Sequence, residues 1–264
     1  MRVIVTRPQR DAQGWVQALS AAGLDVRALP LIEISAVADQ RRLHRAWQGL
    51  DDYVGVMFVS GNAVEAFFAA RPAGCAALGA PAAGKARAWA TGPGTRAALL
   101  RAGVDAAGID APDPDAAQFD SEALWQVVAG QVRPGDRVLI VRGTDGQAEG
   151  PEQGVGRNWF ARRLQEAGAA VDMVISYQRE RPRFSPEQLQ LARAAATDGA
   201  IWLFSSSEAV ANLQACLPGQ DWGAARALTT HGRIAEVARA AGFGVVREVR
   251  PALADILASL ESAG

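Results

Sequence analysis

The chain has 264 residues, of which 49% are hydrophobic, and 27 basic residues against 28 acidic ones leave a net charge of −1. This length and composition predict two compact domains, each large enough to bury its own core. The balanced charge excludes a general attraction to nucleic acid or to an anionic membrane, so a polyanionic partner needs local sites.

Cys75 and Cys216 stand alone, which is typical of reduced, buried thiols rather than of a disulfide framework. No apolar run approaches the roughly 20 residues of a membrane helix. The chain enters a strand-like run at once, without the charged and then apolar leader of a secreted protein. We therefore expect a cytoplasmic protein that binds neither a membrane nor nucleic acid.

The opening stretch VIVTRPQRDAQGWVQALSAAGLDV, from Val3, predicts a strand, a helix and a second strand, and a similar stretch begins at Val138. Two further pairs of segments match in the same way. DDYVGVMFVSGNAVEAFF is similar to DGAIWLFSSSEAVANL, and ARAWATGPGTRAALLRAGV is similar to ARALTTHGRIAEVARAAGF. The whole chain is therefore interpreted as two diverged copies of one α/β unit.

The predicted strands are short, continuous apolar runs such as Val54–Val59, Val138–Val141 and Ile201–Phe204. Such runs indicate strands covered by helices on both faces, as in parallel sheets. Each run is followed by turn residues and then by an amphipathic helix. The predicted fold class is α/β, with two flavodoxin-like, doubly wound parallel-sheet domains joined by a two-stranded linker.

The two copies are not expected to be consecutive domains. ALPLIEI (Ala28–Ile34) and MVISYQRERP (Met173–Pro182) both read as extended segments, at the points where one sheet would be left for the other. If these segments are paired linkers, residues 36–176 form one domain, inserted in a discontinuous domain of residues 1–35 and 177–264. The proline-rich stretch APDPDAAQFDSEALW then reads as a surface loop of the inserted domain, with Ser121 as the N-cap of the next helix.

Few cofactor motifs are present. The sequence has no Walker phosphate loop, and TGPGTRA supplies only Gly92 and Gly94 of a dinucleotide fingerprint. His44 and His231 are the only histidines, and no spacing of histidine or cysteine predicts a metal site. Lys85, the only lysine, lies in a small-residue loop where we do not expect Schiff-base chemistry. We expect a protein without metal or cofactor.

Polar residues recur at the carboxyl ends of predicted strands, directly before helices. They are Thr6-Arg7-Pro8, Ser60-Gly61-Asn62, Thr91-Gly92-Pro93, Ser205-Ser206-Ser207 and Thr230-His231-Gly232. Each alone fits a helix N-cap, which contributes about 1 kcal/mol of helix stability. Together they line the crevice in which open α/β sheets bind ligands, and helix N-termini favour carboxylates or phosphates. Both interpretations hold at once if a substrate displaces a cap.

In their order and two-copy layout, VIVTRP, FVSGNAV, VRGTDG, ISYQRERP, FSSSEAV and TTHGRIAEVARAAG resemble the uroporphyrinogen-III synthase family, over nearly the full length. The resemblance implies a lyase of tetrapyrrole (porphyrin and heme) biosynthesis that needs no cofactor and works as a monomer. Its substrate would be hydroxymethylbilane, a linear tetrapyrrole with eight carboxylates. The product would be uroporphyrinogen III, formed with inversion of the terminal pyrrole ring and loss of water.

The resemblance also implies roles for single residues. Tyr177, in ISYQRERP, matches the family's linker tyrosine and is the expected general acid, with a half-buried anchor as the alternative. Thr95 stands at the threonine of the family's G-x-x-T-A pattern, although Arg96 replaces the alanine. In the other copy the corresponding threonine is missing, and His231 or Arg233 takes its place, unless His231 is only an exposed helix start.

Arg7 and Arg142 fall at equivalent strand ends, where a guanidinium can grip a carboxylate, or instead pair with an acidic side chain of its own domain. The residues expected to bind substrate are Arg7, Ser60, Asn62, Thr91, Gly92, Thr95, Arg142, Gly143, Ser205, Ser206, Ser207, Thr230, His231 and Arg233. Two other interpretations stay open. One is a non-catalytic, two-lobed small-molecule binding module, and the other is a dehydrogenase, which the incomplete glycine fingerprint disfavours.

Overall fold

The computed structural model describes residues 2–75, 78, 86–113, 116, 118–145 and 155–262. In the helix that begins at residue 155, side chains are described only from residue 159 on. Lys85 therefore lies outside the described residues. The chain divides into two compact units, residues 1–33 with 180–264 and residues 34–179, whereas the sequence-based boundaries were 35/36 and 176/177. In the described part of the chain, no helix is long and apolar enough to cross a membrane.

The first unit contains a five-stranded sheet in the order β11-β10-β9-β1-β2, in which every neighbouring pair is parallel. Its strands are β1 (Arg2–Val5), β2 (Asp25–Ala28), β9 (Ile201–Phe204), β10 (Arg226–Thr229) and β11 (Val245–Glu248). Its helices are α1 (Gln9–Ala21), α7 (Pro186–Ala195), α8 (Ser207–Cys216), α9 (Gly232–Ala240) and α10 (Leu253–Glu261).

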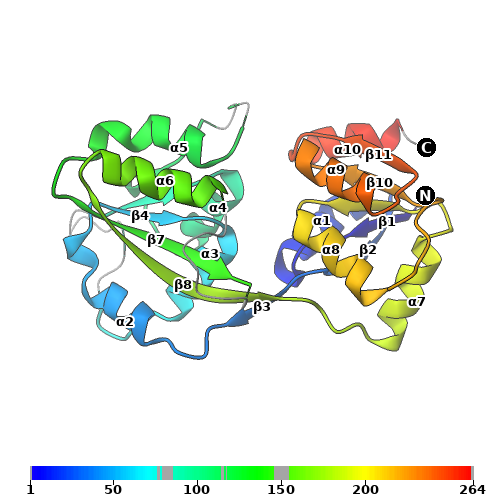
Figure 1. Ribbon diagram of the computed structural model, residues 1–264, viewed down its shortest axis with the longest axis horizontal. Helices are drawn as coiled ribbons and strands as arrows, with labels where there is room; N and C mark the ends of the chain where they lie inside the picture. Colours follow the sequence, from blue (N-terminus) through cyan, green and yellow to red (C-terminus); the bar gives the residue numbers. More distant parts are fainter. Residues whose placement is uncertain are drawn as a thin grey trace. The chain divides into compact units, whose positions relative to one another are not determined.

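The second unit contains a sheet in the order β3-β8-β7-β4-β5-β6 (Figure 1). Its strands are β3 (Glu33–Ala36), β4 (Gly55–Phe58), β5 (Arg87–Ala90), β6 (Ile109–Asp110), β7 (Arg137–Thr144) and β8 (Ala170–Glu180). Its helices are α2 (Arg41–Gln48), α3 (Gly61–Ala69), α4 (Pro93–Arg101), α5 (Ser121–Val128) and α6 (Val155–Glu166). Between β7 and β8, and from β7 through β4 and β5 to β6, the strands are parallel.

The two sheets share one topology, entered by the chain at different points. The order β2-β1-β9-β10-β11 in the first unit corresponds to β8-β7-β4-β5-β6 in the second. Counted from β1 or from β7, each is the 2-1-3-4-5 order of flavodoxin-like folds. The predicted fold class and the predicted internal repeat are therefore confirmed. In the second unit β3 adds a strand beyond β8.

Alternation along the strands of the second unit divides its core between the two faces of the sheet. Val56 and Phe58 of β4 pack with residues of α2, α3 and α4, including Phe67. Met57 of β4 and Trp89 of β5 face the other way and pack with α5 and α6. Figure 1 shows α5 and α6 over one face of this sheet and α2 on the other side. Helices on both faces explain why the strand sequences are continuous apolar runs.

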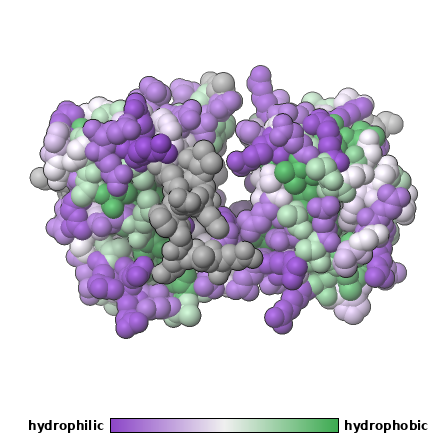
Figure 2. Space-filling model, in the orientation of Figure 1, coloured by the Kyte–Doolittle hydropathy of each residue, from purple (hydrophilic) through white to green (hydrophobic). Residues whose placement is uncertain are grey.

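The first unit follows the same plan. Val3 and Val5 of β1 pack with α1 and α10 on one face. On β9, Trp202 and Phe204 belong to an aromatic cluster that also contains Phe243, 5.4 Å from Phe204 between ring centroids. In both units the face of the molecule shown in Figure 2 is mostly hydrophilic, with hydrophobic residues in small groups.

The N-cap of α5 differs from the prediction. Ser121 is the first helical residue, and Asp120 is the N-cap, with its Oδ1 accepting hydrogen bonds from the N–H groups of Glu122 (3.0 Å) and Ala123 (2.8 Å). The prediction of Ser121 was wrong by one position because aspartate and serine both cap well and are adjacent here.

Candidate functional site

Tyr177 and Ser60 come together at the carboxyl edge of the second sheet, although they lie 117 positions apart in the sequence. Tyr177 is on β8, and Ser60 follows β4, with β7 between these two strands. The Tyr177 hydroxyl oxygen is 3.1 Å from Ser60 Oγ. Only 3% of Tyr177 is exposed. The phenol is thus buried along its ring and held at its hydroxyl end.

Gly143 of β7 makes this crossing possible. It pairs with Tyr177 in the β7–β8 ladder, directly after a register shift between Arg142 and Gly143. A Cβ atom added at Gly143 would lie 2.4 Å from Tyr177 Cζ, a separation that side chains do not tolerate. The aromatic ring therefore lies against the bare backbone of the neighbouring strand, and only glycine fits there.

Ser60 is the N-cap of α3. Its backbone is extended, and its Oγ accepts a hydrogen bond from the Ala63 N–H at 3.2 Å. Asn62, half-buried, is the second residue of this helix. The first N–H groups of a helix have no intrahelical acceptor, so this end of α3 favours negative charge.

A second polar group follows β5. Thr91 Oγ1 donates to the carbonyl of Val59 at 3.4 Å, which connects it to the turn between β4 and α3. Thr91 Oγ1 is also 3.5 Å from Oγ1 of Thr95, a buried residue in the first turn of α4. Gly92 is the N-cap of α4, and a Cβ there would meet Phe119 at 3.0 Å. Thr91 and Thr95 thus lie side by side at the same sheet edge.

The two arginines are not at equivalent strand ends, which corrects the prediction. Arg142 lies within β7, because the pairing with β8 continues to Thr144, whereas β1 stops at Val5, before Arg7. The Arg142 Nε is buried and has no hydrogen-bond partner among the described residues. Arg7 stacks over the ring of Trp15, with 4.6 Å from its Cζ to the ring centroid.

Burial lowers the pKa of Arg7, and the nearby Asp11 carboxylate opposes this effect by raising the pKa. A desolvated cation gains from pairing with an anion that enters its surroundings.

In the first unit the predicted residues lie at two helix starts. Ser206 is the N-cap of α8, and its Oγ accepts from the Glu208 N–H at 3.2 Å. Ser205 precedes it after β9, and Ser207 follows with a buried Oγ that has no partner in the described part of the chain. Of these three serines, Ser206 therefore serves as the helix cap.

His231 is the exposed N-cap of α9, where its Nδ1 accepts from the Arg233 N–H at 3.1 Å. Thr230, half-buried, donates its N–H to the carbonyl of Phe204 at 3.1 Å. The side chain of Arg233 is exposed. The capping interpretation of Ser60, Ser206 and His231 is thus confirmed.

Sequence reasoning missed Ser176. This serine is 2% exposed, and its Oγ lies 3.4 Å from the carbonyl oxygens of both Ala63 and Arg142. It therefore links β8 to α3 and β7, next to Tyr177. A polar residue inside the apolar run VISY was the available signal, but its partners are remote in sequence.

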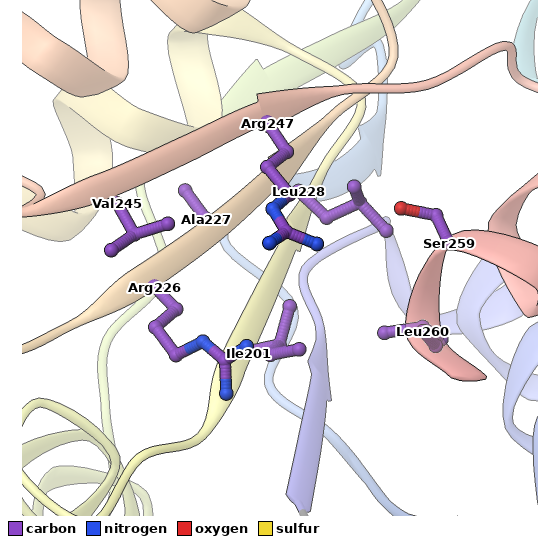
Figure 3. A pocket seen from close by; sticks show the side chains of 8 residues that line it. All are labelled: Ile201, Arg226, Ala227, Leu228, Val245, Arg247, Ser259 and Leu260. Atoms are coloured by element: carbon purple, nitrogen blue, oxygen red, sulfur yellow. The ribbon is translucent and has the colours of Figure 1, made fainter. Parts of the chain in front are cut away.

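Two hollows lie at the opposite, amino edges of the sheets. One, in the first unit, is lined by Arg226, Arg247 and Ser259 with apolar neighbours (Figure 3), and its volume of about 10 Å³ suffices for one water at most. The other, of about 310 Å³ in the second unit, is lined by Asp51–Val54 and by Gly135–Arg137. None of the predicted site residues lines either hollow.

Two doubly wound α/β units, each with polar helix starts at the carboxyl edge of its sheet, define a class of proteins that take small molecules at that edge. A family model described as uroporphyrinogen-III synthase HemD matches residues 13–258. The chain therefore belongs to the uroporphyrinogen-III synthase family, as the sequence resemblance predicted.

Among the solved structures that share this fold are two proteins of the same name. A uroporphyrinogen-III synthetase from Helicobacter pylori is 13% identical, with a TM-score of 0.57 and coverage of 100% of both chains. A mutant uroporphyrinogen III synthase from the extremely thermophilic bacterium Thermus thermophilus is 17% identical, with a TM-score of 0.53 and coverage of 100% of this chain and 98% of that one.

The family is one of lyases in tetrapyrrole and heme biosynthesis, and this chain is an enzyme that cyclises hydroxymethylbilane to uroporphyrinogen III. The predictions of family, reaction and enzyme class are confirmed. The alternative of a non-catalytic binding module receives no support.

Proposed function

We propose that Tyr177 is the general acid of this cyclisation. In the scheme that the family resemblance implies, the hydroxymethyl group leaves as water and an azafulvene cation forms. The substituted carbon of the terminal pyrrole attacks this cation, and the resulting spiro intermediate fragments and recloses with the ring inverted. The substrate supplies the electrophile, so the protein needs to fold the chain and to supply one proton.

The observation that carries this proposal is the position of the Tyr177 hydroxyl. It lies at the carboxyl edge of the sheet, 3.1 Å from Ser60 Oγ, at the N-terminus of α3. Because Gly143 has no side chain, the Tyr177 ring packs against its backbone and is held in one position. A phenol is a modest donor at neutral pH, so we expect a contribution toward the lower part of the roughly 10² to 10⁴ range of general acids.

We also propose that the substrate carboxylates bind at the helix starts and at the arginines. Ser60, Ser206 and His231 each accept one N–H of their helix, and further N–H groups of the first turn remain for an anion. The buried Nε of Arg142 lacks a partner among the described residues, and a carboxylate would satisfy it. We propose that the other residues predicted to bind substrate, among them Thr91 and Thr95, also contact it.

We propose a monomer that works in the cytoplasm without a cofactor, with residues 36–176 inserted in the domain of residues 1–35 and 177–264. The balanced charge and the isolated cysteines support the location, and the family resemblance supports the monomer. Light scattering coupled to size-exclusion chromatography measures the oligomeric state, and a dimeric mass would contradict the proposal.

The decisive experiment supplies hydroxymethylbilane, oxidises the products and separates the porphyrin isomers by chromatography. The uncatalysed reaction gives isomer I, so predominant isomer III is the expected result. A folded protein that yields only isomer I would overturn the assignment of this activity to the chain.

Tyr177→Phe tests the acid. The variant keeps the ring over Gly143 and loses only the hydroxyl, so its structure and stability should stay close to those of the wild type. We expect isomer III to form about 10²-fold more slowly, in line with the loss of a general acid. An unchanged rate would assign Tyr177 to anchoring alone.

A further inference from the structure

We propose that Ser60 passes the proton of Tyr177 to the substrate, so that the two hydroxyls act as a relay and Ser60 is the group that touches the leaving hydroxyl. This inference rests on the proposed role of Tyr177 as the acid. It adds a second catalytic residue, and it gives the N-cap of α3 a function besides capping.

The hydrogen-bond capacity of the two hydroxyls sets the direction of their contact. A serine hydroxyl has one donor and two acceptor positions, and the Ala63 N–H occupies one acceptor position of Ser60. The Tyr177 hydroxyl has Ser60 Oγ as its only hydrogen-bond partner within the described ranges. If Ser60 donated to Tyr177, the phenolic hydrogen would be left without an acceptor in a residue that is 3% exposed. We therefore assign the donor role to Tyr177, which leaves the hydrogen of Ser60 for another acceptor.

The burial of the two residues supports the same direction of proton transfer, from Tyr177 to Ser60 and then to the substrate. Tyr177 belongs to the apolar core cluster that contains Val141 and Val174, and its ring is covered by the backbone of Gly143. Ser60 is only half-buried and precedes the first turn of α3. Of the two residues, Ser60 is the more exposed, so we assign it the contact with the substrate.

The proton transfer balances without any further reagent. The Ser60 O–H bond breaks as its proton joins the leaving hydroxyl, the carbon–oxygen bond of the substrate breaks, and water departs. In the same step the Tyr177 O–H bond breaks and its proton restores the Ser60 hydroxyl, so serine never becomes an alkoxide. The tyrosinate that remains regains a proton when the new ring loses one, and the net reaction releases water alone.

The N-terminus of α3 would stabilise the tyrosinate that forms at Tyr177 when the proton is transferred. A tyrosinate here would lie beside the N-cap of α3, at the end of the helix where the dipole favours negative charge. Ser176 on β8 donates a hydrogen bond to the carbonyl of Ala63 in the same helix, which helps to hold the Tyr177 and Ser60 hydroxyls next to each other.

Four variants separate a relay from mere positioning: Ser60→Ala, Ser60→Thr, Ser60→Asn and Tyr177→Phe. Threonine keeps the hydroxyl and caps helices, and the extended backbone of Ser60 suits a β-branched residue. The asparagine carbonyl can accept from Ala63 and from Tyr177, but its amide does not pass a proton on. The readouts are kcat and KM for isomer III formation. Ser185→Ala is the matched control, because it removes a serine N-cap from α7, outside the proposed site.

We expect Ser60→Ala and Ser60→Asn to lower kcat by the same factor as Tyr177→Phe, about 10²-fold, and the double variant to be no slower than either. Ser60→Thr should keep most of the activity, and Ser185→Ala should keep all of it.

Three results would overturn the relay. They are a Ser60→Ala kcat within about 3-fold of the wild type, effects of Ser60→Ala and Tyr177→Phe that multiply, and recovery in Ser60→Asn. If Tyr177→Phe is slow while Ser60→Ala is not, the relay fails and the acid role of Tyr177 stands. If both are fast, the acid role fails as well.

Discussion

At the residue scale, the contact between Gly143 and Tyr177 shows how a missing side chain on one strand makes room for an aromatic ring from the next strand. The Tyr177 ring lies where a Cβ of residue 143 would be, with three ring atoms within 2.8 Å of that position. The ring thereby bridges β7 and reaches the helix start that follows β4.

Gly143→Ala should therefore destabilise the protein by roughly 1–3 kcal/mol, as overpacking in a core does. It should also lower the rate of isomer III formation, because the displaced ring moves the hydroxyl away from Ser60. Urea denaturation and the isomer assay measure the two effects. Gly14→Ala is the control, since this helical glycine has no atom within 4 Å of an added Cβ. Equal stability of the two variants would contradict the packing described here.

Tyr53 is a second buried phenol, 7% exposed, at the amino edge of the same sheet. Its hydroxyl donates to Asp172 at 3.0 Å, and Arg137 contacts both Asp172, at 2.6 Å, and the face of the ring. Burial, followed by the bond to Asp172 and its charge, raises the pKa of Tyr53 from 10.0 to about 12.

This raised pKa predicts how stability depends on pH. Because the folded state holds the Tyr53 proton more tightly than the unfolded state, the contribution is complete below pH 10.0 and is lost progressively as the pH rises to about 12. Denaturation curves across this range measure the loss. Tyr53→Phe has no proton to release and should show a shallower decline. Parallel curves for the two proteins would contradict the raised pKa.

At the element scale, several helices begin with a polar side chain that caps the first turn. The caps of α3, α8 and α9 are Ser60, Ser206 and His231, all at carboxyl edges of the sheets. A cap holds one or two N–H groups and leaves the others for an anion. The same local feature therefore stabilises the helix and prepares a binding position.

The cap of α5 gives a test of how such starts are assigned. Asp120→Ala should destabilise the protein by about 0.5–2 kcal/mol, because two N–H groups lose their acceptor. Ser121→Ala, one residue later, should change stability by only a few tenths of a kcal/mol, since alanine suits a first helical turn. Thermal or urea denaturation compares the two, and a larger effect at Ser121 would restore it as the cap.

At the scale of the whole molecule, the chain leaves one α/β unit, completes another and returns. Each unit has a sheet of its own with apolar clusters on its faces. In the second unit the chain enters through β3 and leaves through β8, which are neighbours in the sheet.

An excised segment of residues 34–179 should therefore fold alone, with cooperative denaturation and the circular dichroism of an α/β protein. Limited proteolysis of the full chain should yield a fragment close to these limits. A stable fragment of residues 1–135 would contradict the proposed insertion, because it would keep β4–β6 without β7 and β8.

The sequence by itself determined the strands, the parallel sheets, the two copies and the family. Hydrophobic periodicity and turn residues are local properties, and they reappear wherever a copy reappears, as in Ile201–Phe204 and its counterpart β4. Helix caps were also within reach, although Asp120 and Ser121 show that neighbouring good caps compete.

The tertiary structure alone decided which side chains meet. Ser60 and Tyr177 are 117 positions apart, and their contact depends on the order β8-β7-β4 and on the register shift beside Gly143. The hydrogen bonds of Ser176 depend on the same packing. A local pattern states which face of a strand is buried, but strand order and register are set by the summed burial of the whole sheet, so the contacts of the site exist only once that sheet is assembled.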